Sequence, residues 1–244
     1  MSTNNLYLSV IIASYNSADA LQTNLHVLLN YLKVQSYTHE VIIVDDGSKD
    51  GGRTEEIAQH NACRYLKNET NLGKGASVRK GMLASNAQFR IFTDADIPFE
   101  PTVITNILRY LDFKEFHMAV GDRTIDGNDY FVKVNTVRSL ASRMFSFIVG
   151  RFVAGGMFDT QCGIKGFRAE AAEDIFSVAQ INGFAFDVEA FYIALKRNYD
   201  IKRLPVSLRS QDGKSVNIIK NSVVMLLDIS KIIFNFYNGA YEKK

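Results

Sequence analysis

Short apolar runs alternate with helix-period segments along the first hundred residues. The runs are "LSVIIAS" at 8–14, "EVIIVDD" at 40–46, "CRYLK" at 63–67 and "FRIFTDAD" at 89–96. Between the first two runs, leucines at positions 21, 25, 28 and 32 recur at spacings of three and four, which predicts an amphipathic helix. Further helices are expected near 52–60 and 74–87. Apolar strands interleaved with helices favour an α/β fold with a parallel sheet covered on both faces.

Polar side chains close three of these strands. The first strand ends in "ASYNS", the second in "DDGS" and the fourth in "DAD". Ligands of such sheets bind at the carboxyl ends of the strands, so Tyr15, Asp45, Asp46, Asp94 and Asp96 form a candidate site. Ordinary Asx turns at each strand end are the alternative.

Composition narrows the class of protein. A chain of 244 residues, 47% of them hydrophobic, is long enough to bury one sizeable core. The net charge of +2 does not favour a nucleic-acid partner. Cys63 and Cys162 lack the spacing of a metal site or disulfide framework, which indicates reduced, buried thiols. No signal sequence and no charge-free stretch of about 18 residues is visible, so we expect a cytoplasmic protein.

Several motifs together resemble one known family. They are "SVIIASYN", "VDDGS", "NLGKGASVRKG", "FTDAD", "GDR", "DTQCGIKGFR" and "GFAFDVEAFYIALKR". The combination is similar to the family 2 glycosyltransferases, and within them to the polyprenyl-phosphate sugar synthases of the dolichyl-phosphate glucose or mannose type. The resemblance spans about residues 8–217. It implies a GT-A fold, a single Rossmann-like domain over 1–215 whose mostly parallel central sheet is flanked by helices. The implied reaction moves a hexose from a nucleotide sugar to a polyprenyl phosphate with inversion.

The resemblance assigns roles on the donor side of the site. It implies that Asp96 holds Mg²⁺ or Mn²⁺, and that Asp94 faces the ribose or the hydration shell of the metal. A hard divalent cation suits the leaving nucleoside diphosphate, whose charge it neutralises. The base and ribose contacts fall on Tyr15, Asp45 and Asp46. A core aromatic is the alternative for Tyr15.

The segment "NLGKGASVRKG" is glycine-rich but is not a phosphate-binding P-loop. The first glycine of that motif is missing, and no Ser or Thr follows Lys74. We expect the segment to position Lys74 near the donor phosphates, with Gly73 and Gly75 allowing a close approach of the backbone. A solvated lysine at a helix start is the alternative.

The acceptor side separates two kinds of enzyme. A phosphate monoester is already anionic at pH 7, so it needs cations rather than a general base. The resemblance places acceptor-phosphate contacts on Arg123, Arg138 and Ser142, and an arginine fork suits phosphate well. Each arginine is otherwise ordinary surface charge.

Two further motifs are assigned to the sugar pocket. In "DTQCG", Asp159 and Gln161 are expected to line the pocket, or the segment is a structural strand with an Asx turn. In "FAFDVE", Asp187 and Glu189 are expected to hold sugar hydroxyls, or Asp187 caps the helix that begins there.

Departures from the family pattern shape the predicted function. Mannose synthases commonly have a glutamine two residues after "DAD", where this chain has Pro98. A UDP-hexose such as UDP-glucose is therefore favoured as donor, with a dolichyl or undecaprenyl phosphate as acceptor. The alternatives are transfer to a hydroxyl acceptor of a glycan or lipid, and a nucleotide-sugar binding protein without transfer activity.

The carboxy-terminal segment 216–244 has helix-compatible apolar spacing with interspersed lysines. It either packs on the domain or lies in a membrane interface, which would give peripheral contact with the cytoplasmic face of a membrane. The oligomeric state stays open. The residues concerned are Val216, Ile219, Val223, Leu226, Leu227, Ile233, Phe234 and Phe236, with Lys214, Lys220 and Lys231 among them.

Overall fold

The computed structural model describes residues 6–125, 159–160, 162–209 and 218–242. Within these ranges, seven strands form one sheet in the order β3-β2-β1-β4-β6-β5-β7. The strands are β1 Leu8–Ser14, β2 His39–Asp45, β3 Arg64–Lys67, β4 Phe89–Asp94, β5 Met118–Asp122, β6 Ile164–Arg168 and β7 Ile201–Pro205. The helices are α1 Ala18–Lys33, α2 Arg53–His60, α3 Lys74–Ala84, α4 Val103–Asp112, α6 Ala169–Val178, α7 Phe186–Lys196 and α8 Ile218–Tyr237.

The sheet is mostly parallel, as the apolar pattern predicts. Strand β1 pairs in parallel with β2 and β4, β2 with β3, and β5 with β7. Only β6, among these strands, runs antiparallel to its neighbours β4 and β5. The amino-terminal end of β6 therefore meets the carboxyl ends of β4 and β5, which brings residues 159, 160, 162 and 163 to the edge where ligands of such sheets bind.

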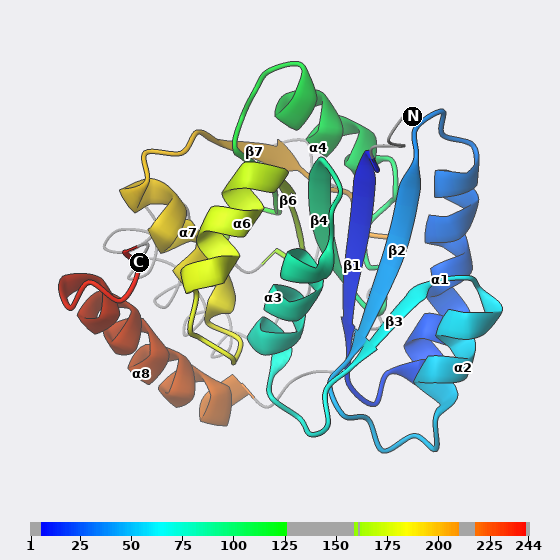
Figure 1. The fold of residues 1–244 in the computed structure, drawn as a ribbon, viewed down its shortest axis with the longest axis horizontal. Helices are drawn as coiled ribbons and strands as arrows, with labels where there is room; N and C mark the ends of the chain where they lie inside the picture. The colour runs from blue at the N-terminus through cyan, green and yellow to red at the C-terminus, as the bar shows by residue number, and fades with distance from the viewer. Residues whose placement is uncertain (1–5, 126–158, 161, 210–217, 243–244) are drawn as a thin grey trace.

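Helices cover both faces of the sheet, so the domain has three layers (Figure 1). Helices α3, α6, α7 and α8 pack on one face, against Ile11, Val44 and Phe92. Helices α1, α2 and α4 pack on the other face, against Val10 and Ile12. Alternate residues of one strand thus enter opposite cores, and each fully buried Val or Ile stabilises the fold by roughly 1.5–3 kcal/mol.

The predicted helices form close to their expected bounds. In α1 the four leucines of the predicted stripe are all buried. Helix α3 ends at Ala84, three residues before the expected end, because Ser85 is extended with a ψ of 141°. The Ser85 hydroxyl bonds to Ser9 Oγ at 2.7 Å and accepts the Ala87 N–H at 3.0 Å, which stabilises the turn into β4.

Helix α8 packs on the domain with one face and leaves another face exposed. Met225, Ile229 and Ile232 belong to the core that α7 also lines, and Figure 1 shows α8 beside α7. Among the residues that the structure describes, no helix combines the length and apolarity needed to cross a membrane. The exposed apolar side chains of α8 are Val224, Leu227, Phe234 and Tyr237.

Phe236 and Phe234 of α8 differ in their exposure to solvent. Phe236 is half-buried and packs against Tyr192 of α7, with ring centroids 5.5 Å apart. Phe234 is 65% exposed. One face of α8 therefore packs on the domain, which is one of the two alternatives given for the carboxy-terminal segment. Of the other residues of that prediction, Lys214 and Val216 lie outside the described residues, as do the side chains of Ile219, Lys220, Val223 and Leu226.

Candidate active site

The carboxyl ends of β1, β2 and β4 bring the first five predicted residues to one edge of the sheet. Ser14 is the register partner of Asp45, and Ala13 is the partner of Asp94. Tyr15 follows β1 and is 43% exposed, so it is not a core aromatic. The amino-terminal ends of β1 and β2 lie at the top of Figure 1, and this edge lies at the bottom.

The carboxylates of the "DAD" segment sit on a tight turn. The Ile97 N–H donates to the Asp94 carbonyl at 3.0 Å, and Ile97 itself has a φ of 44°. Asp96 Oδ1 is buried and has no hydrogen-bond partner among the described residues. Burial, and then the charge of Asp94, raise the pKa of Asp96. A buried carboxylate oxygen without a partner is what a hard divalent cation would satisfy.

Lys74 lies against the same carboxylates. Its Nζ is 2.5 Å from Asp94 Oδ1, and its side chain is one-quarter exposed. Burial disfavours the ammonium form, but the charges of Asp94 and Asp187 outweigh burial and raise the pKa of Lys74. The lysine is therefore a charged member of the site and not a solvated residue.

Asp46 fixes the loop that leads to Lys74. Its carboxylate accepts the Leu72 N–H at 3.0 Å, the Gly73 N–H at 2.8 Å and the Asn68 amide at 2.7 Å. Asp46 is only 3% exposed. Its hydrogen bonds in the structure are with the protein and position the start of α3, and the predicted contact with the nucleotide stays a prediction.

The glycines on either side of Lys74 allow close packing against the segment at 181–183. A Cβ at Gly73, where φ is +105°, would collide with the Asn182 carbonyl oxygen. The Gly75 N–H donates to that same oxygen at 2.7 Å. In the structure these glycines allow a close approach of the backbone to Asn182, and the approach to the donor phosphates stays a prediction.

Asp45 joins two strands and a loop. Its Oδ1 accepts the Ser48 N–H at 3.0 Å, and its Oδ2 accepts the Tyr65 hydroxyl at 2.8 Å. Ser48 Oγ in turn accepts the Asn16 N–H at 2.9 Å. The loops after β1 and β2 are thereby held together beneath the exposed ring of Tyr15.

A buried ion pair lies behind the carboxylate edge. Lys165 on β6 is fully buried, and its Nζ is 2.7 Å from Asp187 Oδ1 and 2.6 Å from the Cys162 carbonyl oxygen. Burial raises the pKa of Asp187, against the opposing charges of Lys165 and Lys74. Helix α7 has Ala185 at its N-cap without a side-chain cap bond, so the capping alternative for Asp187 is wrong.

Lys165 was missed by the motif analysis. The available signal was a lysine inside the apolar strand "GIKGF". A lysine is almost never fully buried unless it is paired, so its position in a predicted buried strand called for a carboxylate partner.

Arg123, which directly follows β5, forms a bidentate ion pair with Asp159. The Asp159 carboxylate accepts Arg123 Nε at 2.9 Å, Nη2 at 2.6 Å and the Arg123 backbone N–H at 2.7 Å. Burial of Asp159 disfavours its charge, but Arg123 outweighs burial and lowers the pKa of Asp159. The structure brings these two predicted residues together, one from the acceptor set and one from the sugar set.

Glu189 is fully buried and faces the protein interior. Its carboxylate accepts the Gln180 N–H at 2.9 Å, the Ile181 N–H at 2.8 Å and the Tyr241 hydroxyl at 2.8 Å. Burial raises the pKa of Glu189, against these hydrogen bonds. The geometry favours a structural role in place of the predicted sugar contact, because both carboxylate oxygens are already used.

We expect Glu189→Gln to lower the stability of the fold by about 2–3 kcal/mol, because an amide replaces a charged acceptor of three hydrogen bonds. Thermal denaturation measures this loss. The KM values for donor and acceptor should match those of wild type below the melting range. Unchanged stability with a raised donor KM would return Glu189 to the sugar pocket.

Arg138, Ser142 and Gln161 lie outside the described residues, and their predicted roles stay predictions. Within the described residues, no group of three or more His, Cys, Asp or Glu side chains is placed to hold a metal ion. Among the described residues, a cation at Asp94 and Asp96 would therefore have these two carboxylates and no third acid, histidine or cysteine as ligands.

The sequence is similar to those of known proteins. The family model for glycosyl transferase family 2 matches residues 9–176. The chain is 32% identical to a dolichyl-phosphate beta-glucosyltransferase of Dictyostelium discoideum, over 98% of this chain and 78% of that protein. It is 29% identical to the human protein of the same name, over 96% of this chain and 77% of that protein.

Solved structures share the fold at low sequence identity. Glucosyl-3-phosphoglycerate synthase from Mycobacterium tuberculosis, in complex with Mn²⁺, UDP and glucosyl-3-phosphoglycerate, superimposes with a TM-score of 0.68. That match has 15% identity and covers 94% of this chain and 79% of the synthase. Mannosyl-3-phosphoglycerate synthase from Rubrobacter xylanophilus has a TM-score of 0.69 at 15% identity, covering 98% and 77% of the two chains. The predicted GT-A fold is confirmed.

Proposed function

Because the chain belongs to glycosyl transferase family 2, we propose that it transfers glucose from UDP-glucose to the phosphate of a dolichol or another polyprenol. The observation that carries the proposal is the similarity, along 98% of the chain, to a dolichyl-phosphate beta-glucosyltransferase. The arrangement of charged side chains in the candidate site is consistent with this proposed reaction. Asp94, Asp96 and Lys74 lie at the carboxyl end of β4, and the Arg123–Asp159 pair lies at the carboxyl end of β5, which β6 separates from β4.

On the donor side, Asp94 and Asp96 would hold Mg²⁺ or Mn²⁺. The fit rests on the unpartnered, buried Oδ1 of Asp96 and on the preference of these cations for carboxylate oxygen. The bound cation supplies charge neutralisation to the leaving diphosphate. The exposed ring of Tyr15 offers a surface for the base, and Asp45 and Asp46 hold the loops on either side of it.

On the acceptor side, a phosphate oxygen attacks the anomeric carbon as the bond to the donor diphosphate breaks. Attack opposite the leaving group inverts the configuration. The acceptor carries its negative charge already at pH 7, so no residue has to remove a proton. Asp159 orients the Arg123 guanidinium, which binds and positions the acceptor phosphate.

The choice of donor is tested with a panel of nucleotide sugars. Purified protein is incubated with Mg²⁺ or Mn²⁺, a polyprenyl phosphate, and UDP-glucose, UDP-galactose or GDP-mannose in turn, and release of the nucleotide is followed. We expect turnover with UDP-glucose at least about tenfold above that with the other sugars. Preference for GDP-mannose would overturn the assigned donor.

We propose that α8 is the element that contacts the membrane where the acceptor resides, at its cytoplasmic face. Leu227 is 67% exposed, Phe234 65% and Tyr237 80%, and Lys231 lies exposed among them. Exposed apolar side chains with interspersed lysine are typical of an interfacial helix on anionic lipid. A polyprenyl chain buried in lipid would need its enzyme at that surface.

Variants of the exposed and of the packed side chains of α8 distinguish membrane contact from packing on the domain. We expect Leu227→Ser with Phe234→Ser to weaken binding to anionic vesicles at least about tenfold, because two exposed apolar anchors are lost. Stability should be unchanged. Phe236→Ser should lower the melting temperature instead, because Phe236 packs on Tyr192. Vesicle binding that survives the double substitution would exclude this face as the membrane contact.

A further inference from the structure

The contact between Lys74 and Asp94 places an ammonium group where a divalent cation would bind. The distance from Lys74 Nζ to Asp94 Oδ1 is 2.5 Å. A metal ligated by that carboxylate would lie next to the ammonium, and the two positive charges would repel each other. Lys74 and the metal therefore compete for one carboxylate.

Asp94 itself is held in place. Gly163 is next to it across the β4–β6 pair, and a Cβ at Gly163 would collide with Asp94 Oδ2. The backbone at the start of α3 is also held, by the three hydrogen bonds that Asp46 accepts and by the packing of Gly73 and Gly75 on Asn182. Among the described residues of this contact, the side chain of Lys74 can therefore move without a shift of the backbone.

Among the described residues, the surroundings of Lys74 favour one direction of movement for its side chain. On the inner side lies Asp187, which is 4% exposed and already paired with Lys165 at 2.7 Å. On its other side, one-quarter of the Lys74 side chain is exposed. An ammonium displaced from Asp94 would therefore turn toward solvent, where the donor diphosphate would lie beside the cation.

We propose that Lys74 is an internal counter-ion of Asp94 that a divalent cation displaces onto the donor diphosphate, so that cation and donor strengthen each other's binding. This inference rests on the proposed function for the identity of the donor. The cation alone must break the Lys74–Asp94 pair, whereas the cation with the donor gives Lys74 a new anionic partner. Such differential interaction is a coupling between two ligands, and it acts equally in both directions.

Titration of Mn²⁺ into the full chain tests the exchange, with free Mn²⁺ followed by its electron paramagnetic resonance signal. In Lys74→Met we expect Mn²⁺ alone to bind about tenfold more tightly than in wild type, the size of one charge-assisted hydrogen bond that no longer has to be broken. In the presence of saturating Mn²⁺, we expect UDP to bind about tenfold more weakly, because its diphosphate loses one such bond. Lys74→Arg keeps a cation on Asp94 and should retain wild-type affinity for Mn²⁺.

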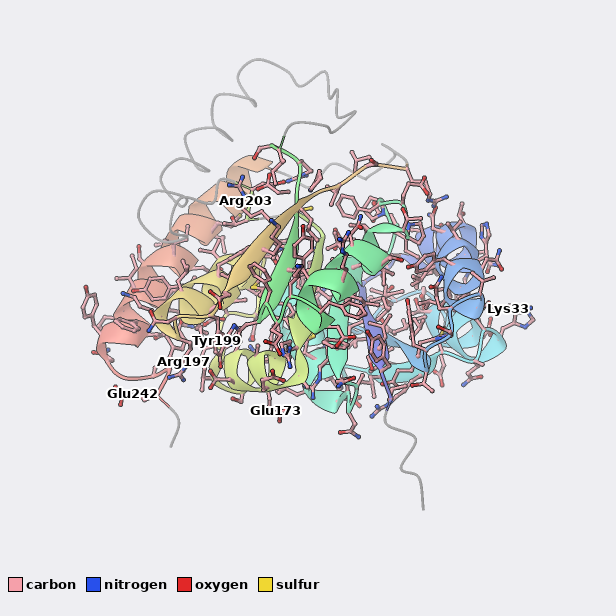
Figure 2. The ribbon with its side chains drawn as sticks, turned by 90° about the horizontal axis from the view of Figure 1, so that it is seen from above. Lys33, Glu173, Arg197, Tyr199, Arg203 and Glu242 are labelled. Atoms are coloured by element: carbon pink, nitrogen blue, oxygen red, sulfur yellow. The ribbon has the colours of Figure 1, made fainter. Side chains whose placement is uncertain are left out.

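Lys33→Met is the control for net charge. Lys33 ends α1, and Figure 2 shows it at the far side of the molecule from α8. The Lys33→Met variant should have wild-type affinity for Mn²⁺ alone and for UDP in the presence of Mn²⁺. Unchanged affinity of Lys74→Met for Mn²⁺ alone, in a variant with wild-type thermal stability, would overturn the exchange. The proposed donor is tested separately. Wild-type protein that binds Mn²⁺ but neither UDP nor UDP-glucose would reject the proposed donor. The difference in Mn²⁺ affinity between wild type and Lys74→Met would still decide whether the cation displaces Lys74.

Discussion

Asp96→Ala is expected to reduce the rate of sugar transfer by about a thousandfold or more while leaving the fold at least as stable as wild type. The rate falls because the cation that neutralises the leaving diphosphate loses a ligand, and each 1.36 kcal/mol of lost transition-state stabilisation is about a tenfold change in rate. Stability is kept because Asp96 Oδ1 is buried without a hydrogen-bond partner among the described residues, and such a group is costly to bury.

Asp19→Asn is the matched control. The Asp19 side chain is 82% exposed and pairs only with exposed Arg53 on α2 among the contacts of the structure. An exposed pair of this kind contributes little to stability. Both the rate and the melting temperature of this variant should stay near wild type. Asp96→Ala with wild-type turnover in the presence of EDTA would remove the metal from the proposed reaction.

Arg123→Lys is expected to raise the KM for the polyprenyl phosphate by about tenfold and to leave donor affinity unchanged. Lysine keeps the positive charge, but its single nitrogen cannot both pair with Asp159 and present further N–H donors to the acceptor phosphate, as the guanidinium can. The variant should also lose about 2–3 kcal/mol of stability, at or below the lower end of the range for breaking a buried ion pair, because Arg123 is one-third exposed. Steady-state kinetics and thermal denaturation measure the two effects.

Arg203→Lys separates the two effects. Arg203 on β7, labelled in Figure 2, donates from Nε to Asp122 Oδ2 at 2.6 Å and so forms a second arginine–carboxylate contact beside the first. A similar loss of stability with an unchanged acceptor KM is expected for this variant. Equal acceptor KM values in wild type and Arg123→Lys, together with a collapsed kcat in Asp159→Asn, would favour a hydroxyl acceptor that needs a carboxylate base.

The contribution of Asp159 to stability has a predictable dependence on pH. Its pKa in the folded protein lies below the unfolded value of 3.8. The stability that it contributes is therefore fully present above about pH 4 and is lost as the pH falls through the folded pKa. The difference in stability between wild type and Asp159→Asn should shrink over that acid range.

The layers of the fold follow from local patterns in the sequence. Continuous apolar runs such as residues 8–14 and 40–46 are buried on both faces, which is the property that distinguishes a covered parallel sheet. The reversed direction of β6 was not predicted, because the sequence of a five-residue strand does not indicate the direction in which its neighbours pair. That reversal is what places residues 159, 160, 162 and 163 at the site.

The roles of side chains were harder to predict than their location. The motif "FAFDVE" predicts that Asp187 and Glu189 both hold sugar hydroxyls, yet residues two apart on a helix do not face the same side. Asp187 accordingly reaches Lys165, and Glu189 reaches the backbone at Gln180 and Ile181. The partners of both acids are set by packing of α7 between separate elements, which motif spacing does not describe.

Asp45 and Asp46, at the end of β2, also have side chains that reach different partners. Adjacent residues of a strand point to opposite faces, so one acid bonds to Tyr65 and the other holds the loop before Lys74. The sequence located both acids at the ligand-binding edge. Their hydrogen-bond partners lie about 20 residues farther along the chain, at Tyr65 and at 68–73.

The identity of the lipid product tests the central claim most directly. Full-length protein is incubated with Mn²⁺, radiolabelled UDP-glucose and vesicles that contain either a polyprenyl phosphate or the corresponding polyprenol, and the lipid fraction is analysed by chromatography and mass spectrometry. The proposed function predicts glucose on the polyprenyl phosphate, in a linkage through its phosphate, and none on the polyprenol. Glucose on the polyprenol hydroxyl, or no labelled lipid while UDP-glucose is bound, would contradict it.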